Sequence, residues 1–334
     1  MTRYLSGKDI LELATYDVCL AAAESAMAAE SDGRTVLPPR IDTPSPTGFL
    51  RAMPAVLDDV MGIKVMTLVR GTGTRYLVLL YGCEDGALRG VFDADELTRL
   101  RTATYTAVAA RLLVDVPPTE LTVLGSGFEA EGHIRVLAQL WPLHRVVVYS
   151  RSADRRSAFA SRLTAELGIE VEGYADRDAA IAAAGVVLLA TKATEPVLDG
   201  RHLRQGAVVL SIGSTRPDLR ELDRATMART GTLLVDDVRS VMLESGDIIE
   251  GLREGDIAES RFAAVAQAAR DQTLLQREPD RDLLTFKSVG TALQDLSLAR
   301  AVLAAAEETE RGRDLGELAT LKPFAESAVA GGSR

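Results

Sequence analysis

The spacing of apolar side chains changes along the chain, and each change predicts a different kind of secondary structure. Residues 8–30 repeat apolar positions at helical intervals and therefore predict one helix. A segment with five prolines, residues 34–54, follows it. The short apolar runs IKVMTLV and YLVLLYG come next, separated by RGTGTR, and they predict a β-hairpin or meander.

A second helix is predicted over residues 93–114. Asp93 or Asp95 is placed to cap its first turn, because a carboxylate accepts hydrogen bonds from the backbone N–H groups that a helix start leaves free. Pro117 and Pro118 end this segment, since the residue before a proline avoids the helical conformation. We therefore expect a domain boundary at these prolines.

From Glu120 onward the chain alternates between short apolar runs and longer amphipathic segments. The runs are LTVLG, RVVVYS, VVLLAT, AVVLSIG and LLVDD, and the segments between them include EAEGHIRVLAQL and DRRSAFASRLTAEL. Strands that are apolar throughout and alternate with helices predict a parallel sheet covered on both faces. Residues 118–285 are therefore predicted to form a doubly wound domain.

The last apolar segment, FKSVGTALQDLSLARAVLAAAEET, predicts one long helix that starts at Phe286. A single helix does not form a domain, so we expect it to pack against the N-terminal part. The predicted fold class is α/β. A doubly wound Rossmann domain, residues 118–285, is inserted into an α+β domain made of residues 1–117 plus 286–334.

The composition excludes several classes of protein. The chain has 334 residues, 47% of them hydrophobic, and a formal net charge of −10 without a run of five Lys or Arg residues. Binding to nucleic acid is therefore not expected, since it depends on clustered cations. Cys19 and Cys83 lack disulfide-framework and zinc-site spacing. Charges near the N-terminus and the lack of an apolar run long enough for a bilayer predict a cytoplasmic protein without membrane contact.

Two further kinds of site are set aside. The three histidines, His133, His144 and His202, do not accompany a nucleophile motif, so triad chemistry is not expected. The acidic segment at residues 243–261 lacks the spacing of a calcium loop, so no metal site is predicted. We interpret this segment as a solvated loop and helix.

The stretch LTVLGSGFEAEGHIRVL contains the spacing G-x-G-x-x-A between a predicted strand and a predicted helix. Gly125 suits the tight turn, Gly127 leaves room for a pyrophosphate, and Ala130 lets the helix approach the strand. The N-terminus of the helix offers free N–H groups to the phosphates. This context predicts dinucleotide binding, with a ligand-free tight turn as the alternative.

The second predicted strand of this domain ends without the Asp or Glu that an NAD site places on the ribose 2′-hydroxyl. Ser150, Arg151, Ser152, Arg155 and Arg156 stand there instead. Hydroxyls and guanidinium groups suit a 2′-phosphate, so NADP(H) is favoured over NAD(H), which stays possible. The alternative is that these arginines only solvate the end of a helix.

Several stretches, in order along the chain, resemble the ornithine cyclodeaminase and mu-crystallin family of NAD(P)-dependent imine-forming and imine-reducing enzymes. They are MPA at residue 53, GIKVM at 62, LTRLRTATYTAVAA at 97, LGSGFEA at 124, ATKATEPVL at 190, IGSTRPDLRELD at 212 and FKSVGTALQDLSLA at 286. The resemblance implies a homodimer in which the N- and C-terminal pieces form the substrate-binding and dimerisation domain. It also implies a small amino or imino acid as substrate.

The resemblance further implies that a basic trio, Arg40, Lys64 and Arg101, holds the α-carboxylate of the substrate. Guanidinium groups bind carboxylates bidentately and would orient the α-carbon for hydride transfer. Lys64, the expected catalytic residue, could pass a proton to or from the substrate nitrogen, since nearby cations disfavour its charged form. Taken singly, Arg40 would equally suit a surface ion pair, Lys64 a charge at a strand edge, and Arg101 a cation on a helix face.

Further positions match the family around the cofactor and the substrate. Asp295 lies two helical turns beyond Ser288 and is expected at the substrate, or else on a helix face. The cofactor is expected to contact Thr102, Gly125, Ser126, Gly127, Phe128, Glu129, Ala130, Ser150, Arg151, Ser152, Arg155, Thr191, Lys192, Gly213, Ser214, Ser288 and Val289.

Three positions depart from the family pattern. Thr215 stands where cyclodeaminases carry a catalytic aspartate, and it has no useful basicity. Arg51 stands where they carry a glutamate for the distal ammonium of the substrate. If Arg51 faces the pocket, it would attract a second acidic group of the substrate, as in an iminodicarboxylate. If it faces solvent, it does not indicate the substrate. Glu129 replaces a frequent glutamine, which is unfavourable beside a pyrophosphate unless it faces away.

The sequence thus favours an NADP-dependent imine reductase or amino-acid dehydrogenase that reduces an α-imino acid to the amino acid, or performs the reverse reaction. Two alternatives stay open. One is a cyclodeaminase of the ornithine or lysine type with bound NAD. The other is a non-catalytic, NADP-binding protein of the mu-crystallin kind.

Overall fold

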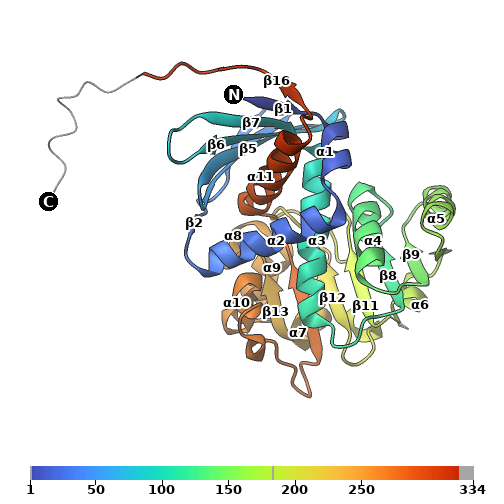
Figure 1. Ribbon diagram of the computed structural model, residues 1–334. Coiled ribbons are helices and arrows are strands. Elements are labelled where there is room, and N and C mark those ends of the chain that lie inside the picture. The colour runs from blue at the N-terminus through green and yellow to red at the C-terminus, as the bar shows by residue number, and fades with distance from the viewer. Residues whose placement is uncertain (1, 183, 323–334) are drawn as a thin grey trace, which may run out of the picture.

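The computed structural model describes residues 2–182 and 184–322, in which the chain forms two separate sheets joined by long helices (Figure 1). Residues 323–334 of the predicted C-terminal piece lie outside the described residues. The first sheet is built from the N-terminal part of the chain and one late strand, and the second sheet from residues 120–287. This arrangement agrees with the predicted α/β fold class.

The first sheet has the strand order β16-β1-β7-β6-β5-β4-β2, and β3 pairs with β4. The predicted hairpin is confirmed, because β4, β5 and β6 pair antiparallel along ten residues each. The strands are β1 Arg3–Leu5, β2 Thr35–Val36, β3 Ile41–Ser45, β4 Gly48–Leu57, β5 Val60–Val69, β6 Gly73–Gly82, β7 Leu88–Asp93 and β16 Arg313–Asp314.

Pro54 lies inside β4 although proline lacks the N–H that a central strand needs. It is tolerated because β3 pairs with β4 only as far as Ala52 and β2 pairs with it only from Val56. The gap between these two partners leaves no ladder bond for the proline to break.

The single helix predicted over residues 8–30 is wrong, because two helices occur there, α1 Gly7–Leu13 and α2 Tyr16–Ser31. Ala14 leaves the helical conformation at φ −82° and ψ 66°. Thr15 then caps α2, because its side chain accepts a hydrogen bond from the backbone N–H of Val18. The periodicity of the apolar residues continues across this break, so only the cap marks it.

The helix α3 Asp95–Leu113 ends before Pro117 as predicted, but its start differs from the prediction. Its N-cap is Ala94 and no side chain caps it, so the predicted cap by Asp93 or Asp95 is wrong. Figure 1 shows α3 running from the first sheet past the second, and it packs against strands of both. Residues on α3 can therefore face a site between the sheets.

The second sheet is parallel throughout, with the order β10-β9-β8-β11-β12-β15-β13-β14, which confirms the doubly wound prediction. Its strands are β8 Glu120–Leu124, β9 Arg145–Tyr149, β10 Glu170–Tyr174, β11 Val186–Leu189, β12 Val208–Ser211, β13 Thr230–Val235, β14 Phe262–Ala264 and β15 Leu283–Lys287. The order reverses at β8, which has β9 on one side and β11 on the other. Ligands of such sheets bind at the carboxyl ends of the strands beside this reversal.

The helices around this sheet follow the alternation seen in the sequence. The α-helices are α4 Phe128–Leu140, α5 Ala153–Leu167, α6 Arg177–Ala182, α7 Arg224–Arg229, α8 Val238–Glu244, α9 Gly246–Glu254 and α10 Val265–Ala268. Short 3₁₀ helices are η1 Gly200–His202, η2 Glu259–Arg261 and η3 Gln272–Leu274.

The prediction of one long helix from Phe286 is wrong at its start. Phe286 and Lys287 complete β15, and the helix α11 begins only at Ala292 and ends at Glu308. α11 packs across β4, β5 and β6 of the first sheet (Figure 1). The chain thus passes from the second sheet back to the first within a few residues. The predicted domain ranges, with a boundary at residue 285 inside β15, stay a prediction.

Candidate active site

The glycine turn between β8 and α4 has the geometry of a phosphate cradle. Gly125 has φ +129°, and a Cβ there would lie 2.5 Å from the carbonyl oxygen of Ala190. A Cβ on Gly127 would meet no atom within 4 Å, so open space lies above the turn. Ala130 is fully buried, and no side chain caps the first N–H groups of α4. These free donors and this space fit the pyrophosphate of a dinucleotide.

The end of β9 lies beside this turn, because the N–H of Gly125 donates to the carbonyl oxygen of Tyr149 at 2.8 Å. Ser126 donates from its hydroxyl to that of Ser150 at 2.9 Å. Arg151 and Arg155 are exposed to solvent at the start of α5. Neighbouring groups have structural partners: Arg156 donates to the carbonyl oxygen of Ser150, and Ser152 caps α5.

A cavity of about 360 Å³ lies between the two sheets, next to the glycine turn. Ten of the residues predicted for the cofactor or the substrate line it. They are Arg40, Arg51, Lys64, Arg101, Thr102, Glu129, Lys192, Thr215, Ser288 and Val289.

Lys64 and Arg101 converge on a single carboxylate oxygen in the cavity wall. The Lys64 ammonium donates to Oδ1 of Asp295 at 2.9 Å and to the Thr98 hydroxyl at 2.7 Å. Arg101 donates from Nε to the same Oδ1 at 3.1 Å and from Nη1 to Gln294 at 2.6 Å. An ammonium has three donors and a guanidinium five, so both cations keep N–H groups for a ligand.

Burial lowers the pKa of Lys64 to about 8, an effect that Asp295 opposes and Arg101 reinforces. Asp295 was predicted to contact the substrate. It is fully buried and does not line the cavity, so it lies behind Lys64 and Arg101 and orients them.

Arg40, the third member of the predicted trio, lines the cavity but already has strong partners. Its guanidinium lies 2.6 Å from a carboxylate oxygen of Glu244 and donates to the carbonyl oxygen of Gly290 at 2.7 Å. Burial raises the pKa of Glu244 to about 7, an effect that Arg40 opposes. Sequence reasoning missed Glu244, since nothing in the acidic segment around it sets this residue apart.

Arg51 lines the cavity rather than facing solvent, which answers the question its sequence position raised. Only 7% of its surface is exposed. Its Nε and Nη2 donate to the two carboxylate oxygens of Asp42, both at 2.6 Å, and its guanidinium lies over the ring of Phe49.

Glu129 also faces the cavity, so its carboxyl group does not point away from the cofactor region. Burial raises its pKa, while Arg101, Lys192 and Lys64 act in the opposite direction. Thr215 lines the same cavity, at the position where the resemblance places the aspartate of cyclodeaminases.

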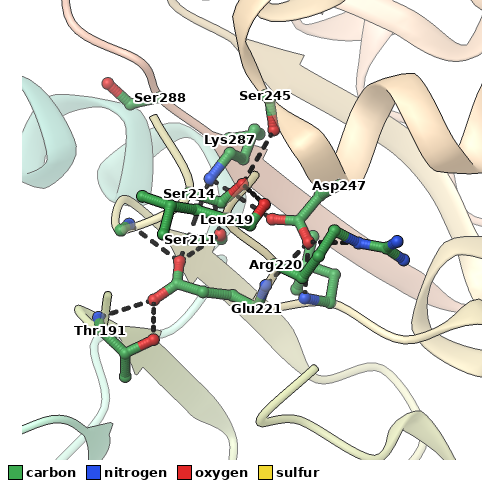
Figure 2. Close-up of polar contacts among 12 residues, drawn as sticks. Thr191, Ser211, Ser214, Leu219, Arg220, Glu221, Ser245, Asp247, Lys287 and Ser288 are labelled. Carbon is green, nitrogen blue, oxygen red and sulfur yellow. Dashed lines mark hydrogen bonds and ion pairs between the residues drawn. The ribbon is translucent and has the colours of Figure 1, made fainter. Parts of the chain in front are cut away.

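A buried carboxylate joins two of the strand ends predicted to hold the cofactor. Figure 2 shows Glu221 between the ends of β11 and β12. It accepts hydrogen bonds from the N–H and the hydroxyl of Thr191, at 2.7 and 2.9 Å, and from the N–H of Gly213 and the hydroxyl of Ser211, both at 2.8 Å. Ser214 is buried beside them and donates to the carbonyl oxygen of Leu219 at 2.7 Å.

Lys287 and Asp247 complete this network (Figure 2). The fully buried Lys287 donates to the Ser211 hydroxyl at 3.0 Å and lies 3.6 Å from Oδ2 of Asp247. Burial raises the pKa of Asp247, whereas Lys287 lowers it. The prediction of a solvated loop and helix at residues 243–261 is therefore wrong for Asp247, which is 1% exposed. A lysine ending the apolar run of β15 was the one available signal for this network.

The turn after β15 is held by a carboxylate that was also missed. Asp236 accepts hydrogen bonds from the hydroxyl of Ser288 and the N–H of Gly290, both at 2.6 Å, and from the N–H of Val289. This turn presents Ser288 and Val289 to the cavity, as predicted. The pair of aspartates that ends the run LLVDD was the available signal.

The combination of glycine turn, basic cavity and inserted fold has a counterpart among known families. A family model described as "Ornithine cyclodeaminase/mu-crystallin family" matches residues 2–310. The chain belongs to this family. The resemblance found in the sequence is thereby confirmed across most of the chain.

The relatives of this member of the ornithine cyclodeaminase/mu-crystallin family include imine reductases. The ketimine reductase mu-crystallin of Mus musculus is 29% identical over 313 residues, covering 90% of this chain and 96% of that protein. A Δ1-pyrroline-2-carboxylate/Δ1-piperideine-2-carboxylate reductase of Azospirillum brasilense is 31% identical over 302 residues, covering 87% and 92%. A solved structure of Thermococcus litoralis Δ1-pyrroline-2-carboxylate reductase with NADH and L-proline has a TM-score of 0.87 at 27% identity, covering 94% of this chain and 100% of that one.

Residues 2–182 and 184–322 contain neither a membrane-spanning helix nor a cluster of metal ligands. In this part of the chain, no helix has both the length and the apolar character that crossing a bilayer requires. The same residues contain no group of three or more His, Cys, Asp or Glu side chains arranged to hold a metal ion.

Proposed function

We propose that this protein is an NADP-dependent oxidoreductase that reduces an α-imino acid to the corresponding amino acid. The observation that supports this most is the convergence of Lys64 and Arg101 on Asp295, in the wall of a cavity that Glu129 of the glycine turn also lines. The names of the relatives, ketimine reductase and Δ1-pyrroline-2-carboxylate reductase, describe the same type of reaction.

The residues present fit a nicotinamide dinucleotide. Gly125, Gly127 and the uncapped start of α4 would hold the pyrophosphate, and Thr191 and Gly213 would lie at the nicotinamide end of the site. When bound, the reduced cofactor supplies a hydride for the α-carbon of the substrate.

The basic side chains of the cavity bind and orient the substrate. The N–H groups that Arg101 does not give to the protein bind the α-carboxylate, and Arg40 and Lys64 lie in the same wall. Fixing this carboxylate places the neighbouring C=N carbon in one orientation, which is the main contribution of such a clamp.

Lys64 supplies the proton that reduction requires. Its pKa of about 8 keeps it protonated at neutral pH yet allows it to release a proton to the substrate nitrogen. Asp295 and Thr98 hold two of its three N–H groups and so direct the third. Asp295 acts here as a positioning residue.

Ornithine-type cyclodeamination is disfavoured by two side chains of the cavity. Thr215 lacks the carboxylate that would activate water or the ring-closing amine, and Arg51 would repel a distal ammonium. Release of ammonia from ornithine or lysine without added cofactor would support this alternative instead.

We propose NADP(H) rather than NAD(H) as the preferred cofactor. The exposed residues Arg151 and Arg155 follow β9, and Ser150 rather than an Asp or Glu directly follows the strand. The solved structure of the Thermococcus litoralis relative contains NADH, so the preference must be measured with both cofactors.

We also propose a homodimer formed through the outer face of the first sheet. Arg51 and Lys64 point to the inner face, where the cavity lies and α11 packs, and cross-strand partners share a face. By the strand registers, the opposite face carries five large apolar residues that are 36–60% exposed. They are Val36, Ile41, Leu50, Val69 and Leu77. An apolar face of this kind is typical of a subunit contact.

The proposed activity is tested with purified protein, NADPH and a panel of cyclic and acyclic α-imino acids. Oxidation of NADPH that depends on an imino acid is expected. The proposal would have to be abandoned if no member of the panel caused it. A parallel titration with NADPH and NADH measures the cofactor preference.

A further inference from the structure

We infer that the imino acid reduced by this protein carries a second carboxylate, held at the far end of the cavity by Arg51 and Arg216. This inference rests on the proposed function and specifies its substrate class. It follows from the positions of two arginines that the α-carboxylate clamp does not use.

Arg51 presents a fixed cation to the cavity. Its fork with Asp42 occupies Nε and Nη2, and the structure gives Nη1 no hydrogen bond among the described residues. Asp42 is 43% exposed in its side chain whereas Arg51 is 9%, so solvent screens the carboxylate more than the guanidinium. The aspartate therefore orients Arg51 while leaving donors for a ligand.

Arg216 repeats this arrangement on the other wall of the cavity. It forms a fork with Asp218 through Nε and Nη2, both at 2.9 Å, and it lines the cavity. The hydrogen bonds from Arg51 lower the pKa of Asp42, and the charges of Arg40 and Arg216 lower it further, so all three cations lie within electrostatic range of this carboxylate. Arg51 and Arg216 form the distal cationic group, and Lys64 and Arg101 the proximal one.

The register of β4 and β5 sets the separation of the two groups. Met53 lies opposite Lys64, and Arg51 lies opposite Met66. Arg51 and Lys64 are thus diagonal neighbours on one face, with Cβ atoms roughly 7–8 Å apart. Met53 and Met66 occupy the other two corners and line the cavity. This pattern suits a short apolar chain with a carboxylate at each end.

The test compares imines that differ only at the distal end. 2-Oxoglutarate and 2-oxopentanoate, each equilibrated with ammonia, give imino acids of equal chain length with a distal carboxylate or a distal methyl group. Oxaloacetate and 2-oxobutanoate give the shorter matched pair. We expect kcat/KM to be about tenfold or more higher for the dicarboxylic member of at least one pair, as a charged hydrogen bond allows.

Arg51→Gln is the decisive variant, and Arg75→Gln, on an exposed part of β6 outside the cavity lining, is its matched control. Arg51→Gln should lower the ratio of dicarboxylic to monocarboxylic kcat/KM by about tenfold. Arg75→Gln should leave the ratio unchanged. Arg51→Lys keeps the charge without the fork, so its ratio should lie between those of the wild type and Arg51→Gln. It replaces Arg51→Gln as the test variant if the glutamine variant does not fold.

Two results would overturn the inference. One is a wild-type protein that prefers the dicarboxylic member of neither pair, and the other is an unchanged ratio in Arg51→Gln. Either would leave the proposed imine reduction intact. Failure of the proposed function looks different, because then no imine of any kind, Δ1-pyrroline-2-carboxylate included, would cause oxidation of NADPH.

Discussion

Charged side chains that are buried in pairs determine the chemistry of this cavity. Lys64 and Arg101 share one oxygen of Asp295, so a carboxylate that does not touch the cavity holds two cations that do. Removing one member of such a group leaves an uncompensated buried charge. The ligand-binding groups are thus held in place before any substrate arrives.

The pH dependence of the reaction should report on Lys64. Its pKa lies near 8 because burial disfavours the ammonium. Reduction uses the ammonium as an acid, so kcat/KM should fall about tenfold per pH unit above pH 8, whereas oxidation of the amino acid uses the free amine and should rise through the same pH. Steady-state rates in both directions measure this. If a Lys64→Met variant kept the same pH profile, Lys64 would not be the group that transfers the proton.

Cofactor preference should depend on Arg151 and Arg155. Replacing both by alanine removes the proposed partners of the 2′-phosphate, so kcat/KM for NADPH should fall about tenfold or more while that for NADH stays nearly constant. A double variant at two exposed arginines outside the cavity lining, Arg201→Ala with Arg253→Ala, is a control of equal charge change. An equal loss for both cofactors would show that these arginines do not select the phosphate.

Individual residues were predictable from the sequence only where their own motif identified them. Lys64, Arg101 and Thr215 stand in the stretches that match the family, and the structure brings all three to one cavity. Glu244 and the Glu221 network were not predictable, because a buried counter-ion is defined by a partner distant in sequence. Glu244, for example, meets Arg40 across some two hundred residues.

At the scale of elements, the strand ends of the second sheet are tied together by one side chain. Glu221 accepts four hydrogen bonds, from Thr191, Ser211 and Gly213, and so fixes the ends of β11 and β12 relative to each other. β11 lies beside β8, where the strand order reverses and dinucleotides bind, and β12 is the next strand.

Glu221→Gln should therefore weaken cofactor binding. An amide group replaces one acceptor oxygen with a donor, so two of the four hydrogen bonds are lost, which should cost about 2 kcal/mol of unfolding free energy. The KM for the cofactor should rise about tenfold through misplacement of Thr191 and Gly213, with a smaller change in kcat. Denaturant unfolding and steady-state kinetics measure the two effects, with the partly exposed Glu254→Gln as control. Lower stability with an unchanged cofactor KM would mean that the network is only structural.

The elements themselves were largely predictable because their periodicity is strong. The five apolar runs predicted as parallel strands are β8, β9, β11, β12 and β13, and the hairpin is correct, whereas β10, β14 and β15 of the same sheet were not predicted. The break at Ala14 is marked only by the cap on α2, the start of α3 has no side-chain cap, and Phe286 belongs to β15, so the spacing of apolar residues alone did not place these ends.

At the scale of the whole molecule, the first sheet has two faces with different tasks. Its inner face presents Arg51 and Lys64 to the cavity, and its outer face exposes apolar residues such as Leu50 and Leu77, which are 43% and 46% exposed. Two features of the sequence predicted the insertion of one domain into the other. The pattern of apolar residues changes after Pro117 and Pro118, and the last helix cannot form a domain alone. The sequence did not indicate which face of the sheet lies open, because β4, β5 and β6 are largely apolar on both.

The proposed dimer should dissociate when a charge is placed on this outer face. Ile63 lies there, in a groove that Pro54 and Val56 also line. Ile63→Lys should shift the mass measured by light scattering from dimer to monomer, because an unpaired charge is costly in an apolar contact. Val116→Lys, at a residue 77% exposed outside this sheet, should leave the mass unchanged. A wild-type protein that is monomeric at all concentrations would refute the dimer.

The most direct test of the whole account follows the transferred hydrogen. Wild-type protein is given an α-imino acid and reduced cofactor in which both hydrogens at C4 of the nicotinamide are deuterium, and the amino acid formed is analysed by NMR and mass spectrometry. We predict one deuterium on its α-carbon and one cofactor oxidised per product molecule. Product without deuterium at that carbon, or ammonia released from ornithine or lysine without net cofactor oxidation, would contradict the account.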